Sequence, residues 1–249
     1  MMRYFIYLSY DGTDYHGWQI QPNAVSVQGE IERCLSTILR RNTPVVGAGR
    51  TDTGVHARMM AAHFETENAI DHEQVGFRLN RMVPPDIAIH RIVPVADDMH
   101  ARFSATSRTY HYYIHTRKSP FLRKYSLETH YNLDFEAMNK AGEYLLTVKD
   151  FATFCKAGSD VKTTFCDVRT AKWVENAPGE WYFEITADRF LRNMVRAVVG
   201  TLVDVGRGKL SMDEFKKAVD AHRRSEARES MPAHALFLEN ITYPDTPCK

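Results

Sequence analysis

Long hydrophobic runs and paired cysteines are both missing from this 249-residue sequence. No apolar stretch approaches the roughly 18–20 residues that a membrane-crossing helix needs, and the amino-terminal residues show no signal-peptide pattern. Cys34, Cys155, Cys166 and Cys248 have no C-x-x-C spacing, which excludes the common zinc motifs and a disulfide framework. We therefore expect reduced thiols in a cytoplasmic protein without a membrane segment.

Lysine is absent before Lys118, so arginine alone supplies the basic side chains of the first half. Residues 1–103 hold 10 arginines against 12 acids, and residues 104–249 hold 22 basic residues against 19 acids. The net charge of +1 does not by itself indicate a nucleic-acid partner. Arginine binds phosphate in a bidentate geometry and stacks on bases, so its use here is compatible with RNA binding.

Hydrophobic periodicity divides the chain into two halves with similar element orders. In the first half we expect strands at 3–10, 45–47, 59–64 and 87–95, with helices that begin after Ser26 and Asp71. In the second half we expect strands at 108–115, 163–174, 181–187 and 236–243, and helices at 133–146, 190–205 and 211–222. The first order is β-α-β-β-α-β, and the second adds one helix.

This order predicts an α+β protein made of two ferredoxin-like halves, residues 1–103 and 104–249. Their antiparallel sheets could join edge to edge into one continuous sheet, with helices on one face and a central groove for the active site on the other. An open sheet face suits RNA docking, although a fold alone does not set a function.

The segment from Gly47 to Ala57 is rich in glycine and carries one carboxylate, Asp52, two residues after Arg50. Glycines let a backbone turn sharply and approach a ligand closely. A carboxylate fixed in such a turn can act as a nucleophile or as an electrostatic stabiliser. The plainer alternative is a turn between strands in which Arg50 and Asp52 form a surface ion pair.

Two patterns in the second half could serve the same site. Arg189, Arg192 and Arg196 recur at spacings of three and four, which predicts one helical face. Arg196 lies between apolar residues, so we expect it to be partly buried, with Asp52 as a candidate partner. Tyr110, on the 108–115 strand, could stack on an extruded base, although packing is the ordinary role of such a tyrosine.

With these residues in place, Gly49-Arg-Thr-Asp-Thr-Gly-Val-His56 resembles the catalytic loop of the bacterial tRNA pseudouridine synthase A family. Further similarities extend along nearly the whole chain. They lie at residues 10–13 (YDGT), 16–18 (HGW), 103–105 (FSA), 108–110 (RTY), 190–196 (FLRNMVR) and 231–233 (MPA).

The resemblance implies roles for five residues. Asp52 would be the essential catalytic aspartate, Tyr110 the tyrosine that stacks on the target uracil, and Arg196 the partner of the aspartate. Arg50 would help to hold the flipped-out nucleotide, and Leu236 would pack in the pocket. The resemblance also implies a homodimer without cofactor or metal that isomerises uridines 38, 39 and 40 in the anticodon stem-loop of tRNA.

Three departures from the family pattern stand beside this resemblance. Thr53 follows the aspartate where alanine is usual, Asp188-Arg189 replaces a small or glycine-rich pair, and His234-Ala235 replaces an acid and a glycine. The last departure bears on the assignment of Leu236.

Two other functions compete with this interpretation. The D-T-G sequence at residues 52–54 also occurs in aspartic proteases, where two such carboxylates share a proton. A doubled ferredoxin-like scaffold could also bind RNA without catalysis. For the isomerase, Asp52 could attack C1′, add to C6 or assist a glycal route, and these three alternatives stay open.

Overall fold

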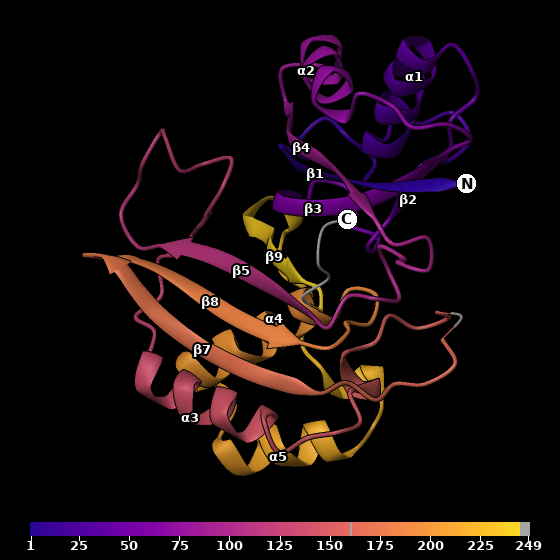
Figure 1. The fold of residues 1–249 in the computed structure, drawn as a ribbon. Helices are drawn as coiled ribbons and strands as arrows, with labels where there is room; N and C mark the ends of the chain where they lie inside the picture. The colour runs from indigo at the N-terminus through magenta and orange to yellow at the C-terminus, as the bar shows by residue number, and fades with distance from the viewer. Residues whose placement is uncertain (160, 245–249) are drawn as a thin grey trace. The chain divides into compact units, whose positions relative to one another are not determined.

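The computed structural model describes residues 1–159 and 161–244, and these contain five α-helices and nine strands (Figure 1). The α+β class is confirmed. Tertiary contacts divide the chain into two compact units, Met1–Thr106 with Phe237–Lys249, and Ser107–Leu236. Cys34, Cys155 and Cys166 are free and buried, and Cys248 lies outside the described residues. Among the described helices, none is long and apolar enough to cross a membrane.

The first unit is a sheet with the strand order β4-β1-β3-β9. β1 (Met2–Tyr10) pairs antiparallel with β3 (His56–Thr66) and with β4 (Ile87–Val95). Two short pairings complete it: β2 (Val46–Gly47) lies antiparallel to β3, and β9 (Leu236–Thr242) lies parallel to it. The expected strands of the first half are therefore confirmed, and β3 is longer than its predicted core.

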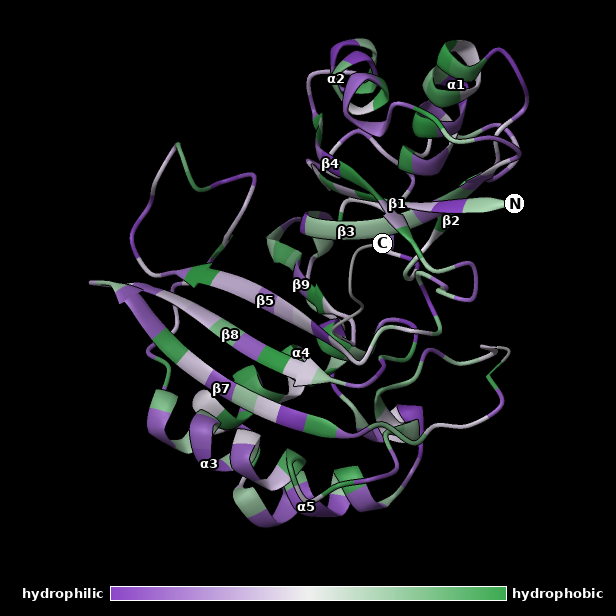
Figure 2. Cartoon of the chain, viewed as in Figure 1, coloured by the Kyte–Doolittle hydropathy of each residue, from purple (hydrophilic) through white to green (hydrophobic). Residues whose placement is uncertain are grey.

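Two helices cover one face of this sheet, and both begin where the sequence predicts (Figure 1). Ser26 caps α1 (Val27–Leu39) by accepting a hydrogen bond from the backbone N–H of Gly29. Asp71 caps α2 (His72–Met82) in the same way, and the helix ends before Pro84. The apolar faces of the two helices supply the core above the sheet (Figure 2).

The second unit has a central antiparallel sheet in the order β5-β8-β7. Its strands are β5 (Ser107–His115), β7 (Val168–Ala177) and β8 (Glu180–Ala187), and β6 (Leu127–Glu128) pairs parallel with β5. The helices α3 (Phe135–Leu145), α4 (Met194–Gly206) and α5 (Met212–Asp220) pack on one side of it (Figure 1). Asp134 caps α3, and Ser211 with Glu214 forms the predicted capping box of α5.

Two predicted boundaries in this unit are wrong. The strand expected from residue 163 begins only at Val168, because the segment before it forms an isolated bridge between Asp150 and Phe165. The helix expected from residue 190 begins only at Met194, because Asn193 adopts a left-handed backbone conformation with φ of 64°. The short strand β6 is an element that periodicity did not reveal.

Contacts place the division between the units after Thr106, and they group the chain from Phe237 onward with the first unit. The last strand therefore contacts β3 of the first unit, at His56↔Phe237 and Ala57↔Leu238. The division into two ferredoxin-like halves, 1–103 and 104–249, which was based on the repeated order of elements, stays a prediction.

Candidate active site

Asp52 lies in the loop that connects β2 to β3 in the first unit, and its side chain is half-buried. Its backbone oxygen accepts a hydrogen bond from the N–H of Val55 at 3.1 Å, which closes a turn. Gly54 sits inside that turn at φ of +78°, a conformation that residues with a Cβ rarely adopt. The local sequence thus bends the chain around the carboxylate.

A second loop, residues 11–18, holds the Asp52 loop from the side. The N–H of Trp18 donates to the oxygen of Thr51 at 3.3 Å, and the N–H of Gly54 donates to the oxygen of Tyr15 at 3.4 Å. The hydroxyls of Tyr10 and Thr51 are 2.9 Å apart and hydrogen-bonded. Both flanks of Asp52 are therefore tied to neighbouring backbone, which reduces the freedom of its carboxylate.

Glycine is required at the closest points between these loops. A Cβ on Gly12 would lie 2.1 Å from the oxygen of Val55, and one on Gly17 would lie 2.3 Å from the oxygen of Thr51. Gly17 also has φ of +84°. The aromatic and glycine-rich composition of residues 11–18 was visible in the sequence, but its role as a support for Asp52 was not predicted.

Buried polar groups beneath the loop are paired. The imidazole of His56 accepts the N–H of Gly12 at its Nδ1, 3.0 Å away, and stacks on Phe237 with ring centroids 4.5 Å apart. The hydroxyl of Tyr15 donates to the Asp86 carboxylate at 2.6 Å. Burial and this carboxylate raise the pKa of Tyr15 well above its usual range, so the hydroxyl stays protonated and keeps the bond.

Arg50 is exposed to solvent. The salt bridges formed within residues 1–159 and 161–244 do not include one between Arg50 and Asp52. The turn of the simpler interpretation is present between β2 and β3, but its surface ion pair between Arg50 and Asp52 is not formed. Because Arg50 is exposed, a ligand could reach it.

In the second unit, Tyr110 lies on β5 opposite Ile185 of β8 and is half-exposed. Its ring meets that of Phe190 edge to face, with centroids 5.0 Å apart. Tyr112, two residues further on, points to the same face of the strand but is fully buried, and its hydroxyl donates to the oxygen of Pro232 at 3.0 Å. The strand thus presents one buried and one accessible tyrosine on a single face.

Arg196 lies in the first turn of α4 and is half-buried, as predicted. Its Nε donates to the backbone oxygen of Met231 at 2.6 Å, and the N–H of Met231 donates to the backbone oxygen of Arg196 at 3.1 Å. The prediction that Arg189 and Arg192 share its helical face is wrong, because both precede the first residue of α4. Met231 was not predicted to support Arg196.

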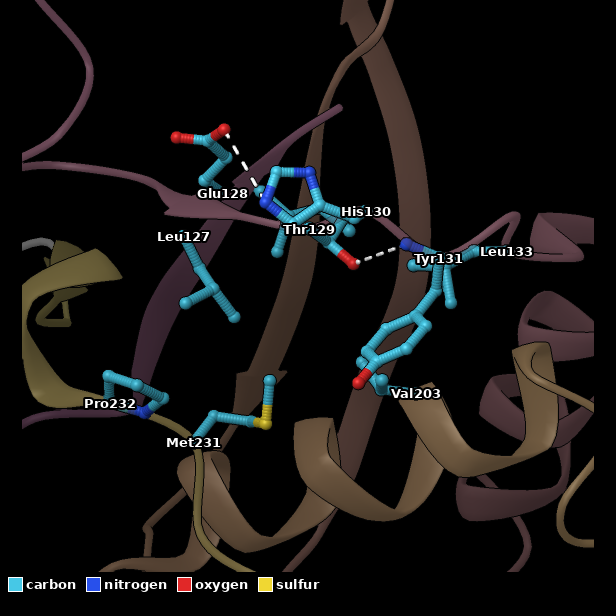
Figure 3. A pocket seen from close by; sticks show the side chains of 10 residues that line it. Leu127, Glu128, Thr129, His130, Tyr131, Leu133, Val203, Met231 and Pro232 are labelled. Carbon is cyan, nitrogen blue, oxygen red and sulfur yellow. Dashed lines mark hydrogen bonds and ion pairs between the residues drawn. The ribbon is translucent and has the colours of Figure 1, made fainter. Parts of the chain in front are cut away.

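Leu236 is buried and follows a short 3-10 turn at Ala233–Ala235. Nearby Met231 and Pro232 line a cavity of about 350 Å³, together with Leu127, Tyr131 and Val203 (Figure 3). The cavity is mainly apolar, and Glu128 and His130 at its edge lie 3.7 Å apart. Because Met231 both lines this cavity and holds Arg196, the packing of the cavity bears on the position of the guanidinium.

A family model described as tRNA pseudouridine synthase matches residues 6–104 and 141–244. The chain belongs to the tRNA pseudouridine synthase family. Asp52, Arg50, Arg196 and Leu236 fall inside the segments that match the family model, and Tyr110 falls between them.

Individual relatives agree with membership of the pseudouridine synthase family. A protein of Bacteroides thetaiotaomicron named tRNA pseudouridine synthase A is 53% identical over 247 residues, which covers 98% of this chain and 92% of the relative. One of Bacteroides fragilis with the same name is 52% identical over 245 residues, with 98% and 97% covered. One of Bacillus subtilis with the same name is 39% identical over 246 residues, with 97% and 99% covered. The aspartic protease interpretation of D-T-G is set aside.

Proposed function

We propose that this chain converts uridine to pseudouridine at positions 38, 39 and 40 of the tRNA anticodon stem-loop, with Asp52 as the essential carboxylate. The observation that carries the proposal is the Asp52 loop itself. It holds one carboxylate between two glycine-dependent contacts, in a chain that belongs to the tRNA pseudouridine synthase family. A carboxylate held in this way needs little reorganisation when a reaction centre arrives.

The reaction breaks the N1–C1′ glycosidic bond, turns the uracil and joins its C5 to C1′. The proton on C5 leaves and a proton is taken up at N1, so no atom is gained or lost. In this proposal Asp52 would serve by attack on C1′, by addition to C6 or by assistance to a glycal route. The base must first leave the helical stack, which costs a few kcal/mol.

The other four residues would bind the extruded nucleotide and support the carboxylate. Tyr110 would stack on the uracil, because its ring is half-exposed beside Phe190. Arg196 would pair with Asp52, and its hydrogen bond to Met231 supports a fixed orientation of the guanidinium. Arg50 would contact the nucleotide from its exposed position, and Leu236 would provide an apolar wall.

Two further properties belong to this proposal. We expect the enzyme to act as a homodimer in the cytoplasm, where its tRNA substrate is found. We also expect activity without an added cofactor or metal ion, because an isomerisation of this kind involves no redox step.

The test is incubation of the purified protein with unmodified tRNA transcript, followed by carbodiimide mapping of pseudouridine. The expected result is modification of uridines at positions 38–40 and no signal when those uridines are replaced by cytidine. Modification at other positions would refute the site assignment. Tight binding of the transcript without any pseudouridine would favour the alternative of a non-catalytic RNA-binding protein.

A further inference from the structure

The loop between β5 and β6, residues 116–126, is exposed and strongly basic. Its sequence TRKSPFLRKYS contains four cations and no acid. The four basic side chains, Arg117, Lys118, Arg123 and Lys124, are all exposed. Within residues 1–159 and 161–244 none of these four takes part in a salt bridge. Their charge is therefore available to an anionic partner.

The same loop exposes two aromatic rings, one between its two pairs of cations and one directly after the second pair. Phe121 is 86% exposed and Tyr125 is 39% exposed. A single exposed aromatic ring is ordinary. Phe121 differs because it lies in sequence between Arg117-Lys118 and Arg123-Lys124, the cations without a salt bridge described above. Cations that contact phosphates, combined with rings on which bases stack, form the usual binding surface for unpaired nucleic acid.

The base of the loop is firmly held. His115 and Ser126, both buried, are joined by a hydrogen bond of 2.9 Å, and Thr129 donates its N–H to the oxygen of His115 at 2.8 Å. Thr116 donates its N–H to the oxygen of Gly179 in the β7–β8 turn at 2.9 Å. The loop leaves and re-enters the sheet at these points and projects beyond the end of β5, with mostly hydrophilic colouring (Figures 1 and 2).

We propose that loop 116–126 is a tRNA-binding arm, in which the four cations contact backbone phosphates and Phe121 packs against an unpaired base. The partner is RNA because charge and exposed aromatic surface occur together on one anchored loop. This inference rests on the proposed function in one respect, that tRNA is the substrate. The residues involved are separate from the five that we assign to catalysis and to binding of the target nucleotide.

The first experiment measures tRNA affinity as a function of salt concentration. The variant carries Arg117→Gln, Lys118→Gln, Arg123→Gln and Lys124→Gln. A control that also loses four positive charges carries Lys140→Gln, Lys172→Gln, Lys209→Gln and Lys217→Gln. These four lysines are exposed and lie in the same unit but outside the loop. Each phosphate contact contributes about 0.9 to the slope of log K against log salt. We expect the slope of the loop variant to be smaller in magnitude by about 2 to 4, and its affinity for tRNA to fall by about tenfold or more. The slope of the control should change by less than about 1.

The second experiment tests Phe121. Phe121→Ala should weaken binding by about fivefold to a hundredfold, the range measured for loss of one base–aromatic stack. A photoreactive benzoylphenylalanine at position 121 should crosslink to an unpaired nucleotide of the tRNA. The same residue at position 165, where Phe165 is 61% exposed, should not crosslink.

Equal losses in the loop variant and its control, or an absence of crosslinks at position 121, would overturn the inference. A change in the mass of the Phe121→Ala variant by light scattering, with tRNA affinity unchanged, would assign the loop to self-association instead. Failure of the proposed function is distinguishable from failure of this inference. If the protein with benzoylphenylalanine at position 121 crosslinks to tRNA but the wild type forms no pseudouridine, only the proposed function fails. If the wild type forms pseudouridine but the loop variant keeps the wild-type salt slope, only this inference fails.

Discussion

Arg196 and Met231 are joined by two reciprocal hydrogen bonds. The guanidinium Nε donates to the Met231 oxygen at 2.6 Å, and the Met231 N–H donates to the Arg196 oxygen at 3.1 Å. One bond fixes the side chain and the other fixes the backbone from which it extends. The guanidinium is therefore aimed before any substrate binds, which is the property that electrostatic preorganisation requires.

Arg196→Lys should keep the positive charge but lose the bond to Met231, because a lysine ammonium does not reproduce the position of Nε. We expect a loss of about 1–3 kcal/mol in the free energy of unfolding, measured by urea denaturation, and a large fall in turnover. Arg192→Lys, at an exposed position just before α4, is the matched control and should change neither quantity much. Equal effects of the two substitutions would contradict this account of Arg196.

Gly17→Ala should disturb the Asp52 loop from outside. The added Cβ would meet the Thr51 oxygen at 2.3 Å, and the backbone at φ of +84° disfavours any side chain. We expect a stability loss of more than about 1 kcal/mol and a reduced rate of pseudouridine formation. Gly49→Ala is the control for stability, because a Cβ there meets no atom within 4 Å. An unaltered melting temperature for Gly17→Ala would show that the two loops are not tightly packed.

Tyr110→Phe separates stacking from proton transfer. The ring and its contact with Phe190 are retained, so tRNA affinity should stay within a few fold of the wild type. If the hydroxyl moves a proton during the reaction, single-turnover rates should fall by about 100-fold or more. Tyr113→Phe, on the opposite face of β5, is the control. Near-normal rates for Tyr110→Phe would restrict this residue to stacking on the base.

His63 should make the protein less stable at mildly acidic pH. Burial, followed by the nearby charges of His100 and Arg3, lowers the pKa of His63 from 6.5 to about 4, with Glu65 acting in the opposite sense. The neutral ring also accepts the N–H of Ala101 at Nδ1, 3.1 Å away. The folded state thus binds fewer protons than the unfolded state between these two pH values. The contribution of neutral His63 to the free energy of unfolding is complete above pH 6.5, falls as the pH drops and is lost near pH 4.

Through this effect, the free energy of unfolding should be about 2 kcal/mol lower at pH 5 than at pH 7. Urea denaturation at the two pH values should show it in the wild type, and His63→Gln should reduce the difference. His130→Gln, at an exposed position, should leave the difference as it is. A difference that is the same in all three proteins would show that other groups govern the acid sensitivity.

Much of the fold was predictable because its signals are local. Ser26, Asp71 and the Ser211–Glu214 capping box each mark a helix start through a side chain and a backbone N–H only three residues away. The start of α4 was not predictable in this way. Apolar periodicity continues back to Phe190, but Asn193 takes the left-handed conformation while its side chain bonds to Ser230, a partner distant in sequence.

In the candidate site, too, features with local sequence signals were predictable and contacts between residues distant in sequence were not. Asp52 could be selected as a candidate from its glycine-rich loop, because the composition of a turn is visible in consecutive residues. The supports of the site could not be identified, because Gly17 contacts Thr51 and Arg196 contacts Met231 only after folding. The predicted arginine face failed for the same reason, as Arg189 and Arg192 lie in the segment that precedes α4.

The most direct test of the central claim compares Asp52→Asn with Asp14→Asn, an exposed carboxylate in the neighbouring loop. Pseudouridine formed on unmodified tRNA is measured by carbodiimide mapping under single-turnover conditions, alongside tRNA affinity. We expect no detectable pseudouridine with Asp52→Asn, affinity within a few fold of the wild type, and normal activity for Asp14→Asn. Appreciable pseudouridine formation by the Asp52→Asn variant would contradict this claim.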